Sequence, residues 1–71
     1  MSYRRIDLGL GVYSFSTDYS VSSFNFEDEF VATETVEVNN VVLDFDESGR
    51  LVGLEFLTDD VVPRPLLDCR D

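Results

Sequence analysis

The chain has no histidine, no lysine and no tryptophan, and its 71 residues include one cysteine and two prolines. Without histidine, and with no nucleophile–base pair or phosphate-binding loop in view, it lacks the usual equipment of acid–base catalysis, and we predict that it is not an enzyme. Cys69 is alone and no secretory signal is evident, so we expect a reducing, cytoplasmic setting. No apolar run approaches the roughly 18 residues that a membrane helix needs, so we expect no membrane partner.

Positive charge is also scarce, because fifteen acidic residues face five arginines and the formal net charge is −10. Residues 27–60 hold the whole excess, with eleven acids and a single cation, Arg50. Direct binding to nucleic acid is disfavoured, because phosphate contacts need cations. We expect instead a protein partner with a basic surface. The simpler alternative is that the acids only keep the chain soluble.

Hydrophobic residues make up 44% of the chain and aromatic residues 13%, which is enough for one small core. The length lies near the lower limit for a self-sufficient domain. We therefore expect one domain without a cofactor. A second copy of the chain would add buried area, so we also expect a homodimer.

Residues 44–55, DFDESGRLVGLE, fit two incompatible structures. One is a β-hairpin with a glycine-bearing turn. The other is a calcium loop, whose spacing is met by Asp44, Asp46, Ser48, Gly49 and Glu55. The upstream flank, VEVNNVVL, is β-branched, and Pro63 and Pro65 would break an exit helix downstream. We favour the hairpin and keep calcium binding at residues 44–55 as an alternative.

Two predicted turns set the register of this region. A two-residue turn at Asn39-Asn40 would pair Val38 with Val41 and Val36 with Leu43. A four-residue turn over residues 46–49 would then pair Phe45 with Arg50, Leu43 with Val52 and Val41 with Leu54. Both turns place the same apolar residues on one face, which a slip of one residue would destroy. The other face mixes apolar and acidic residues, and we predict a candidate acidic interaction face made of Glu34, Glu37, Asp44 and Glu55.

The fold class expected for the chain is mostly β: a small antiparallel β-meander of four to five strands over residues 1–57. We expect strands over residues 3–16, 19–26, 30–38, 41–45 and 50–57, the first with Ile6, Leu8, Leu10 and Val12 on one side. Residues 58–71 form a C-terminal tail that packs on the sheet or on a partner. Within it, a helical turn is predicted to begin at Pro65.

Residues 34–57 resemble the signature of DUF2283, a family of small bacterial and phage proteins of unknown function. The matching residues are Glu34, Glu37, Val38, Val42, Asp44, Asp46, Gly49, Leu51, Val52, Gly53, Leu54, Glu55, Phe56 and Leu57. The tyrosine–aspartate–proline opening of the family is only partly present, since residues 13–26 keep a Tyr and an Asp but lack the Pro. The resemblance implies a small, mostly β fold with no established activity, and by analogy an antitoxin-like role in a bacterial or, for a phage gene, host cytoplasm.

These observations favour a non-enzymatic acidic protein-binding domain, such as a phage or bacterial inhibitor or antitoxin. The alternative in a different class is a DNA mimic, whose carboxylates would imitate phosphates and compete for a nucleic-acid-binding protein. An enzyme is the third class, with acid–base chemistry on Asp44 and Asp46 or on Glu55. An assay panel without turnover would separate this class from the first two.

Overall fold

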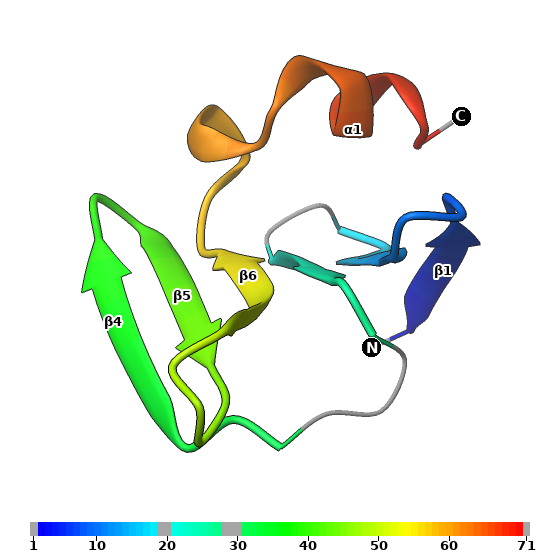
Figure 1. Cartoon of the computed structure of the whole chain (residues 1–71). Helices are drawn as coiled ribbons and strands as arrows, with labels where there is room; N and C mark the ends of the chain where they lie inside the picture. The colour runs from blue at the N-terminus through cyan, green and yellow to red at the C-terminus, as the bar shows by residue number, and fades with distance from the viewer. Residues whose placement is uncertain (1, 19–20, 28–30, 71) are drawn as a thin grey trace.

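A computed structural model describes residues 2–18, 21–27 and 31–70. These residues form one six-stranded antiparallel sheet followed by a 3₁₀ turn and a short helix (Figure 1). The elements are β1 (Tyr3–Asp7), β2 (Val12–Ser16), β3 (Ser22–Asn25), β4 (Glu34–Val38), β5 (Val41–Phe45), β6 (Leu51–Phe56), η1 (Asp59–Val61) and α1 (Arg64–Asp68). The predicted mostly β, antiparallel fold is confirmed, with six strands where four to five were expected. No helix in the described ranges is long and apolar enough to cross a membrane.

The strand order, β1-β2-β3-β6-β5-β4, departs from a simple meander at one place. β3 pairs with β6, with Ser22 opposite Phe56, and not with β4. The chain therefore crosses from the middle of the sheet to its far edge between β3 and β4, and returns through two hairpins. As a result β1 and β4 are the two edges. The third strand was predicted over residues 30–38; the described strand begins at Glu34, and residue 30 lies outside the described residues.

The N-terminal segment, predicted as one strand over residues 3–16, is a hairpin made of β1 and β2. Gly9 turns the chain with a φ of 78°, a conformation that glycine adopts without steric cost. The Gly9 amide donates to Asp7 Oδ1 at 2.9 Å, which stabilises the turn. Leu10, predicted on the apolar side of a strand, lies in the turn with 83% of its surface exposed. The alternating pattern did not reveal the turn, because Gly9 and Gly11 occupy the positions between apolar residues that a continuous strand would also have.

The Asn39-Asn40 turn is confirmed. Val38 lies opposite Val41 and Val36 opposite Leu43, as predicted. The two asparagines have φ values of 49° and 68°, which is the geometry of a type I′ turn between twisted strands.

The register of the second hairpin differs from the prediction by two residues at Val41 and Leu43 and by one residue at Phe45. Val41 lies opposite Phe56 and Leu43 opposite Leu54, where Leu54 and Val52 were predicted, and Phe45 lies opposite Leu51 rather than Arg50. An irregularity between Asp44 and Phe45 lets the β6 strand take up one extra residue near the turn. A shift of two residues leaves each side chain on the same face of its strand. Leu54 and Phe56 therefore still share a face with Val41 and Leu43, as predicted.

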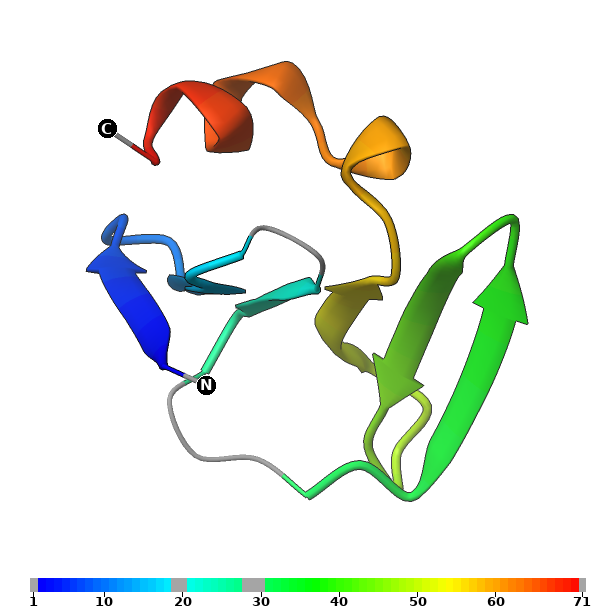
Figure 2. The same ribbon diagram turned by 180° about the vertical axis from the view of Figure 1, so that it is seen from behind.

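The core lies between one face of the sheet and the C-terminal tail. We call this side the covered face; its strand residues include Tyr13, Phe15, Phe24, Leu54 and Phe56. Val62 from the tail is buried among Tyr13, Phe15 and Phe56, and Val61, Leu66 and Leu67 pack around them. Both views show η1 and α1 above this side, while β4 and β5 lie at the other end of the sheet, away from α1 (Figures 1 and 2).

Arg70 ties the end of the tail to the sheet. Its side chain is 8% exposed, and its Nε and Nη2 donate to Tyr13 Oη at 3.0 and 2.6 Å, while Nη1 donates to Asp59 Oδ1 at 2.9 Å. The guanidinium also lies over the ring of Phe15, 5.2 Å from its centroid. Burial lowers the pKa of Arg70, but the hydrogen bonds to Asp59 and Tyr13 raise it by more, so the group stays charged.

Candidate binding site on the acidic face of the sheet

The face opposite the tail is polar, and we call it the acidic face. The pairing of strands places two rows of side chains across it. One row runs through Val12, Asn25, Gly53, Asp44 and Thr35, and the other through Ser14, Ser23, Glu55, Val42 and Glu37. Within these rows, Asp44 and Glu55 are diagonal neighbours on adjacent strands, which is close enough for their side chains to meet.

Asp44 and Glu55 form the centre of the site. Asp44 is only 4% exposed, and its carboxyl group shares a hydrogen bond with that of Glu55. Among the residues that the structure describes, no arginine forms an ion pair with either acid. No N–H or other O–H group in that part of the chain donates to Asp44. Because Asp44 also lines a pocket, a ligand that enters there can supply hydrogen-bond donors that the described residues do not.

The pKa of Glu55 is raised above its ordinary value of 4.5. Burial is the largest cause, because it disfavours the charged form. The negative charge of Asp44 and the hydrogen bond to it act in the same direction.

Gly53 leaves the space in which the site is built. A Cβ at this position would lie 2.8 Å from Asn25 Oδ1 and 3.4 Å from Asp44 Oδ2. The side chains of Asn25 on β3 and Asp44 on β5 therefore both lean over the β6 backbone at Gly53. Any larger residue would push at least one of them away.

A concave pocket of about 350 Å³ opens above these groups. Its lining residues are Ser23, Asn25, Ala32, Thr35, Asp44 and Glu55. The pocket therefore combines two carboxyl groups with neutral hydroxyl and amide groups, and its lining residues come from β3, β4, β5, β6 and the segment before β4. Its size lies near the lower end of the range for small-ligand pockets.

The four residues of the predicted acidic interaction face are divided by the structure. Asp44 and Glu55 come together in the pocket. Glu37 lies on the same face but is exposed, with Val42 between it and Glu55. Glu34 lies on the opposite side of β4, because it pairs with Phe45. Sequence reasoning missed Ser23 and Asn25, and no local signal marks them, because only the β3–β6 pairing brings them to Asp44 and Glu55.

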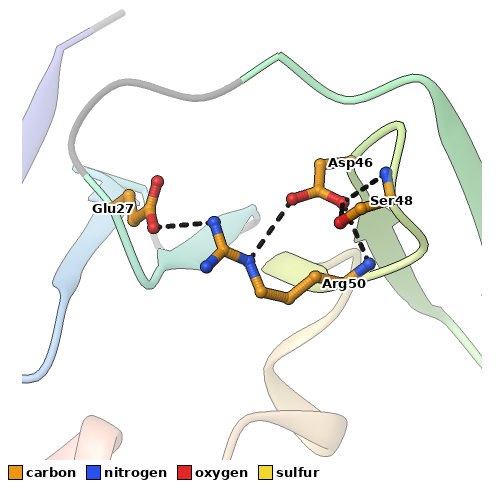
Figure 3. Close-up of polar contacts among 4 residues, drawn as sticks. All are labelled: Glu27, Asp46, Ser48 and Arg50. Atoms are coloured by element: carbon orange, nitrogen blue, oxygen red, sulfur yellow. Dashed lines mark hydrogen bonds and ion pairs between the residues drawn. The ribbon is translucent and has the colours of Figure 1, made fainter.

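The aspartate-rich stretch at residues 44–55 is a strand–loop–strand, as the hairpin interpretation predicted. Asp46 Oδ1 accepts from the Ser48 amide, the Ser48 hydroxyl and the Arg50 amide, at 2.9, 2.6 and 2.9 Å (Figure 3). The guanidinium of Arg50 bridges Asp46 Oδ2, at 3.3 Å, and Glu27 Oε1, at 3.0 Å. These hydrogen bonds, first of all the one from the Ser48 hydroxyl, lower the pKa of Asp46. The spacing of Asp46, Ser48 and Arg50 is therefore explained by the hydrogen bonds that hold this turn.

A second hollow, of about 440 Å³, lies beside this loop. Its acidic lining residues include Glu27 and Asp46, both of which Arg50 already contacts. Among the described residues, no group of three or more His, Cys, Asp or Glu side chains is arranged to hold a metal ion. The Asp44–Glu55 pocket is therefore the stronger candidate for a binding site.

Comparison with known proteins gives one match. The sequence profile described as "Protein of unknown function (DUF2283)" matches residues 22–58. No curated protein and no solved structure matches. The matched segment is more than half of the chain and runs from β3 to the end of β6, so it contains the whole Asp44–Glu55 pocket. The chain therefore belongs to DUF2283, a family of proteins of unknown function.

Proposed function

We propose that the chain is a non-enzymatic protein-binding domain that recognises a basic surface on another protein through its acidic face, as an inhibitor or antitoxin would. The observation that carries the proposal is the Asp44 carboxylate, which is buried, has no donor other than Glu55 among the described residues and lines an open pocket. The excess of acids over residues 27–60 adds long-range attraction to a cationic partner. Such attraction speeds encounter and disfavours acidic competitors.

The geometry supports binding to a basic protein better than imitation of DNA. A DNA mimic needs a continuous series of carboxylates at the spacing of phosphates. Here Glu34 and Glu37 lie on opposite faces of β4, and Val42 separates Glu37 from Glu55. The acids of this region therefore do not form a continuous phosphate-like row.

Affinity capture tests this function. The tagged chain is exposed to a lysate of the organism that carries the gene, and each retained protein is then purified and titrated against the chain by calorimetry. We expect a basic partner whose affinity falls as salt is raised. The Asp44→Asn/Glu55→Gln variant should bind it at least about ten-fold more weakly, which corresponds to about 1.4 kcal/mol.

Glu34→Gln is the matched control, because it removes one charge from the other face and should leave the affinity nearly unchanged. The proposal fails if no purified protein binds the chain directly. It also fails if the pocket variant binds the partner as tightly as the unaltered chain does.

We also propose a homodimer, because β4 has a free edge and all five of its residues are exposed, including Val36 and Val38. Antiparallel pairing of two β4 strands about Val36 would place Thr35 opposite Glu37 and Glu34 opposite Val38. No two like charges would then face each other directly. Light scattering at rising concentration should show a dimer, and Val36→Lys should return it to a monomer. A monomer at every concentration would contradict this proposal.

A further inference from the structure

We propose that the Asp44–Glu55 pocket binds one guanidinium group, supplied by an arginine side chain of the partner. This inference rests on the proposed function for the source of the arginine, but the pocket itself can be tested without a partner. The carboxyl groups of Asp44, the more buried of the two, and of Glu55 both line the pocket and are its charged acceptors. The guanidinium would anchor the complex at this point.

Asp44 is a mostly buried residue whose carboxyl group lines the pocket and receives few hydrogen bonds from the described residues. At 4% exposure it has lost most of its contact with water, yet within the described ranges only the carboxyl group of Glu55 bonds to it. An incoming cation with several N–H donors would restore the lost hydrogen bonds and neutralise the paired acids at once. An apolar or anionic group would leave both acids without compensation.

The size and composition of the pocket favour a planar organic cation over a metal ion. A divalent ion is usually held by several carboxylates, and among the described residues no group of three or more His, Cys, Asp or Glu side chains is arranged to hold one. Ser23, Asn25 and Thr35 supply neutral oxygens at the rim, which can accept the N–H groups that the two acids do not reach. A flat group with donors along its edges can use both sets of acceptors.

Arginine suits this pocket better than lysine. Guanidinium presents five donors in a rigid fork and is less strongly hydrated than ammonium, so it loses less on entering a partly buried site. The chain already uses its own arginines in this way. Arg50 bridges Glu27 and Asp46 (Figure 3). Arg70 bridges Tyr13 and Asp59. The pair Asp44 and Glu55 has the same need and no such arginine among the described residues.

Binding of the cation should also depend on pH. Glu55 faces Asp44 on β5, and Glu37 on β4 lies in the same row; β3 contributes Ser23 and Asn25, which do not titrate. Arg5 on β1 lies three strands away in that row. A guanidinium favours the ionised form of Glu55, so binding should release a proton and strengthen as pH rises above 4.5.

The test uses N-acetyl-arginine amide, followed by the amide resonances of the ¹⁵N-labelled chain in NMR. We expect saturable shifts at Asn25, Asp44, Gly53 and Glu55, with a dissociation constant of order 1 mM. N-acetyl-citrulline amide has nearly the same shape without the charge and should produce no saturable shift. N-acetyl-lysine amide should bind several-fold more weakly.

Matched variants then locate the site. Asp44→Asn should weaken binding of the arginine amide by about ten-fold or more, and Glu34→Gln should change it by less than about two-fold. If Asp44→Asn does not fold, Glu55→Gln serves in its place, because Glu55 is less buried and its protonated form is isosteric with glutamine. Equal loss in Glu34→Gln, or equal binding of the lysine and arginine amides, would overturn the proposal. Saturation by calcium chloride at micromolar concentration, with exclusion of the arginine amide, would overturn it in favour of a metal site.

The guanidinium site and the proposed function can fail separately. If a basic partner binds through the acidic face but the arginine amide does not bind, the anchor is wrong and the function stands. If the arginine amide binds in the pocket but no purified protein does, the guanidinium site stands and the function is wrong.

Discussion

The two faces of this sheet differ in how their buried charged side chains are paired. On the covered face, Tyr13, Phe15 and Phe56 are almost fully buried under Val62, and the polar Arg70 that enters this layer has a partner for each of its nitrogens. On the acidic face, Asp44 is nearly as deeply buried but has no N–H donor among the described residues, and a second acid lies beside it. A charge retained at a cost in stability is typical of a functional site, and a charge fully paired is typical of a structural one.

The largest expected effect comes from opening the covered face. Phe15→Ala would leave a cavity in a core of only a few large side chains and should cost about 3–5 kcal/mol. A domain of this size has about 4–10 kcal/mol of stability in all, so much of the chain should unfold. Urea denaturation followed by circular dichroism measures the loss. Leu10→Ala, at the exposed turn, should change the free energy of unfolding by less than about 0.5 kcal/mol. Similar losses in the two variants would contradict the assignment of the core.

The next effect comes from removing the cation of the covered face. Arg70→Ala should cost about 2–4 kcal/mol, because Tyr13 and Asp59 lose a buried partner. Arg64→Ala is the matched control, since the pair of Arg64 with Asp68 is 4.0 Å long and exposed at both ends. We expect that control to stay within about 0.5 kcal/mol in the same denaturation experiment. A tail that does not depend on Arg70 would show no difference between the two arginines.

A smaller effect should follow from filling the space at Gly53. Gly53→Ala would force the Asn25 side chain away from its present place, 2.8 Å from the new Cβ. We expect a loss of about 1 kcal/mol, or about 4–8 °C in Tm, because the Asn25 side chain can move, whereas the backbone oxygen of Phe24, 3.3 Å from the new Cβ, can move less. Calorimetry measures the change, and Thr35→Ala on the same face should be nearly neutral. A gain in Tm for Gly53→Ala would show that Asn25 does not pack closely against Gly53.

The smallest effect should have the opposite sign. The raised pKa of Glu55 means that the folded chain binds this proton more tightly than the unfolded chain does. The stabilising contribution is therefore complete below pH 4.5 and is lost as pH rises through the folded pKa. Glu55→Gln imitates the protonated form and should raise Tm by a few degrees at pH 7 but not at pH 4. Thermal melts of both proteins across that range, with Glu34→Gln as the control, measure it. An equal gain at both pH values would show that protonation of Glu55 is not the cause.

Local turn chemistry was predictable from the sequence, and register was less so. Asn39-Asn40 tolerates positive φ at two consecutive positions, so the turn and the pairing of Val38 with Val41 followed directly. The irregularity lies at Phe45, next to the loop that Asp46 holds. An alternating pattern looks the same after a shift of two residues, so it could not reveal the register. The N-terminal hairpin was missed for a related reason. The alternation of apolar residues continues through Gly9 in the sequence, although the chain turns there.

The candidate site was only half predictable. Asp44 and Glu55 stood out as acids within an apolar hairpin, and the hairpin brings them together. Glu34 was wrongly expected to share their face, because its charge suggested that face while its position along β4 places it on the other. Asn25 and Gly53 meet only because β3 inserts beside β6, a contact between segments nearly thirty residues apart. No pattern within either segment specifies that pairing.

The sequence by itself determined the mostly β class, the acidic middle segment and the two central turns, because each depends on residues that are neighbours along the chain. The tertiary structure alone decided the strand order, the burial of Arg70 against Tyr13 and the burial of Asp44. These features depend on which segments, far apart in the sequence, bury their surfaces against each other. The packing of the whole chain determines that.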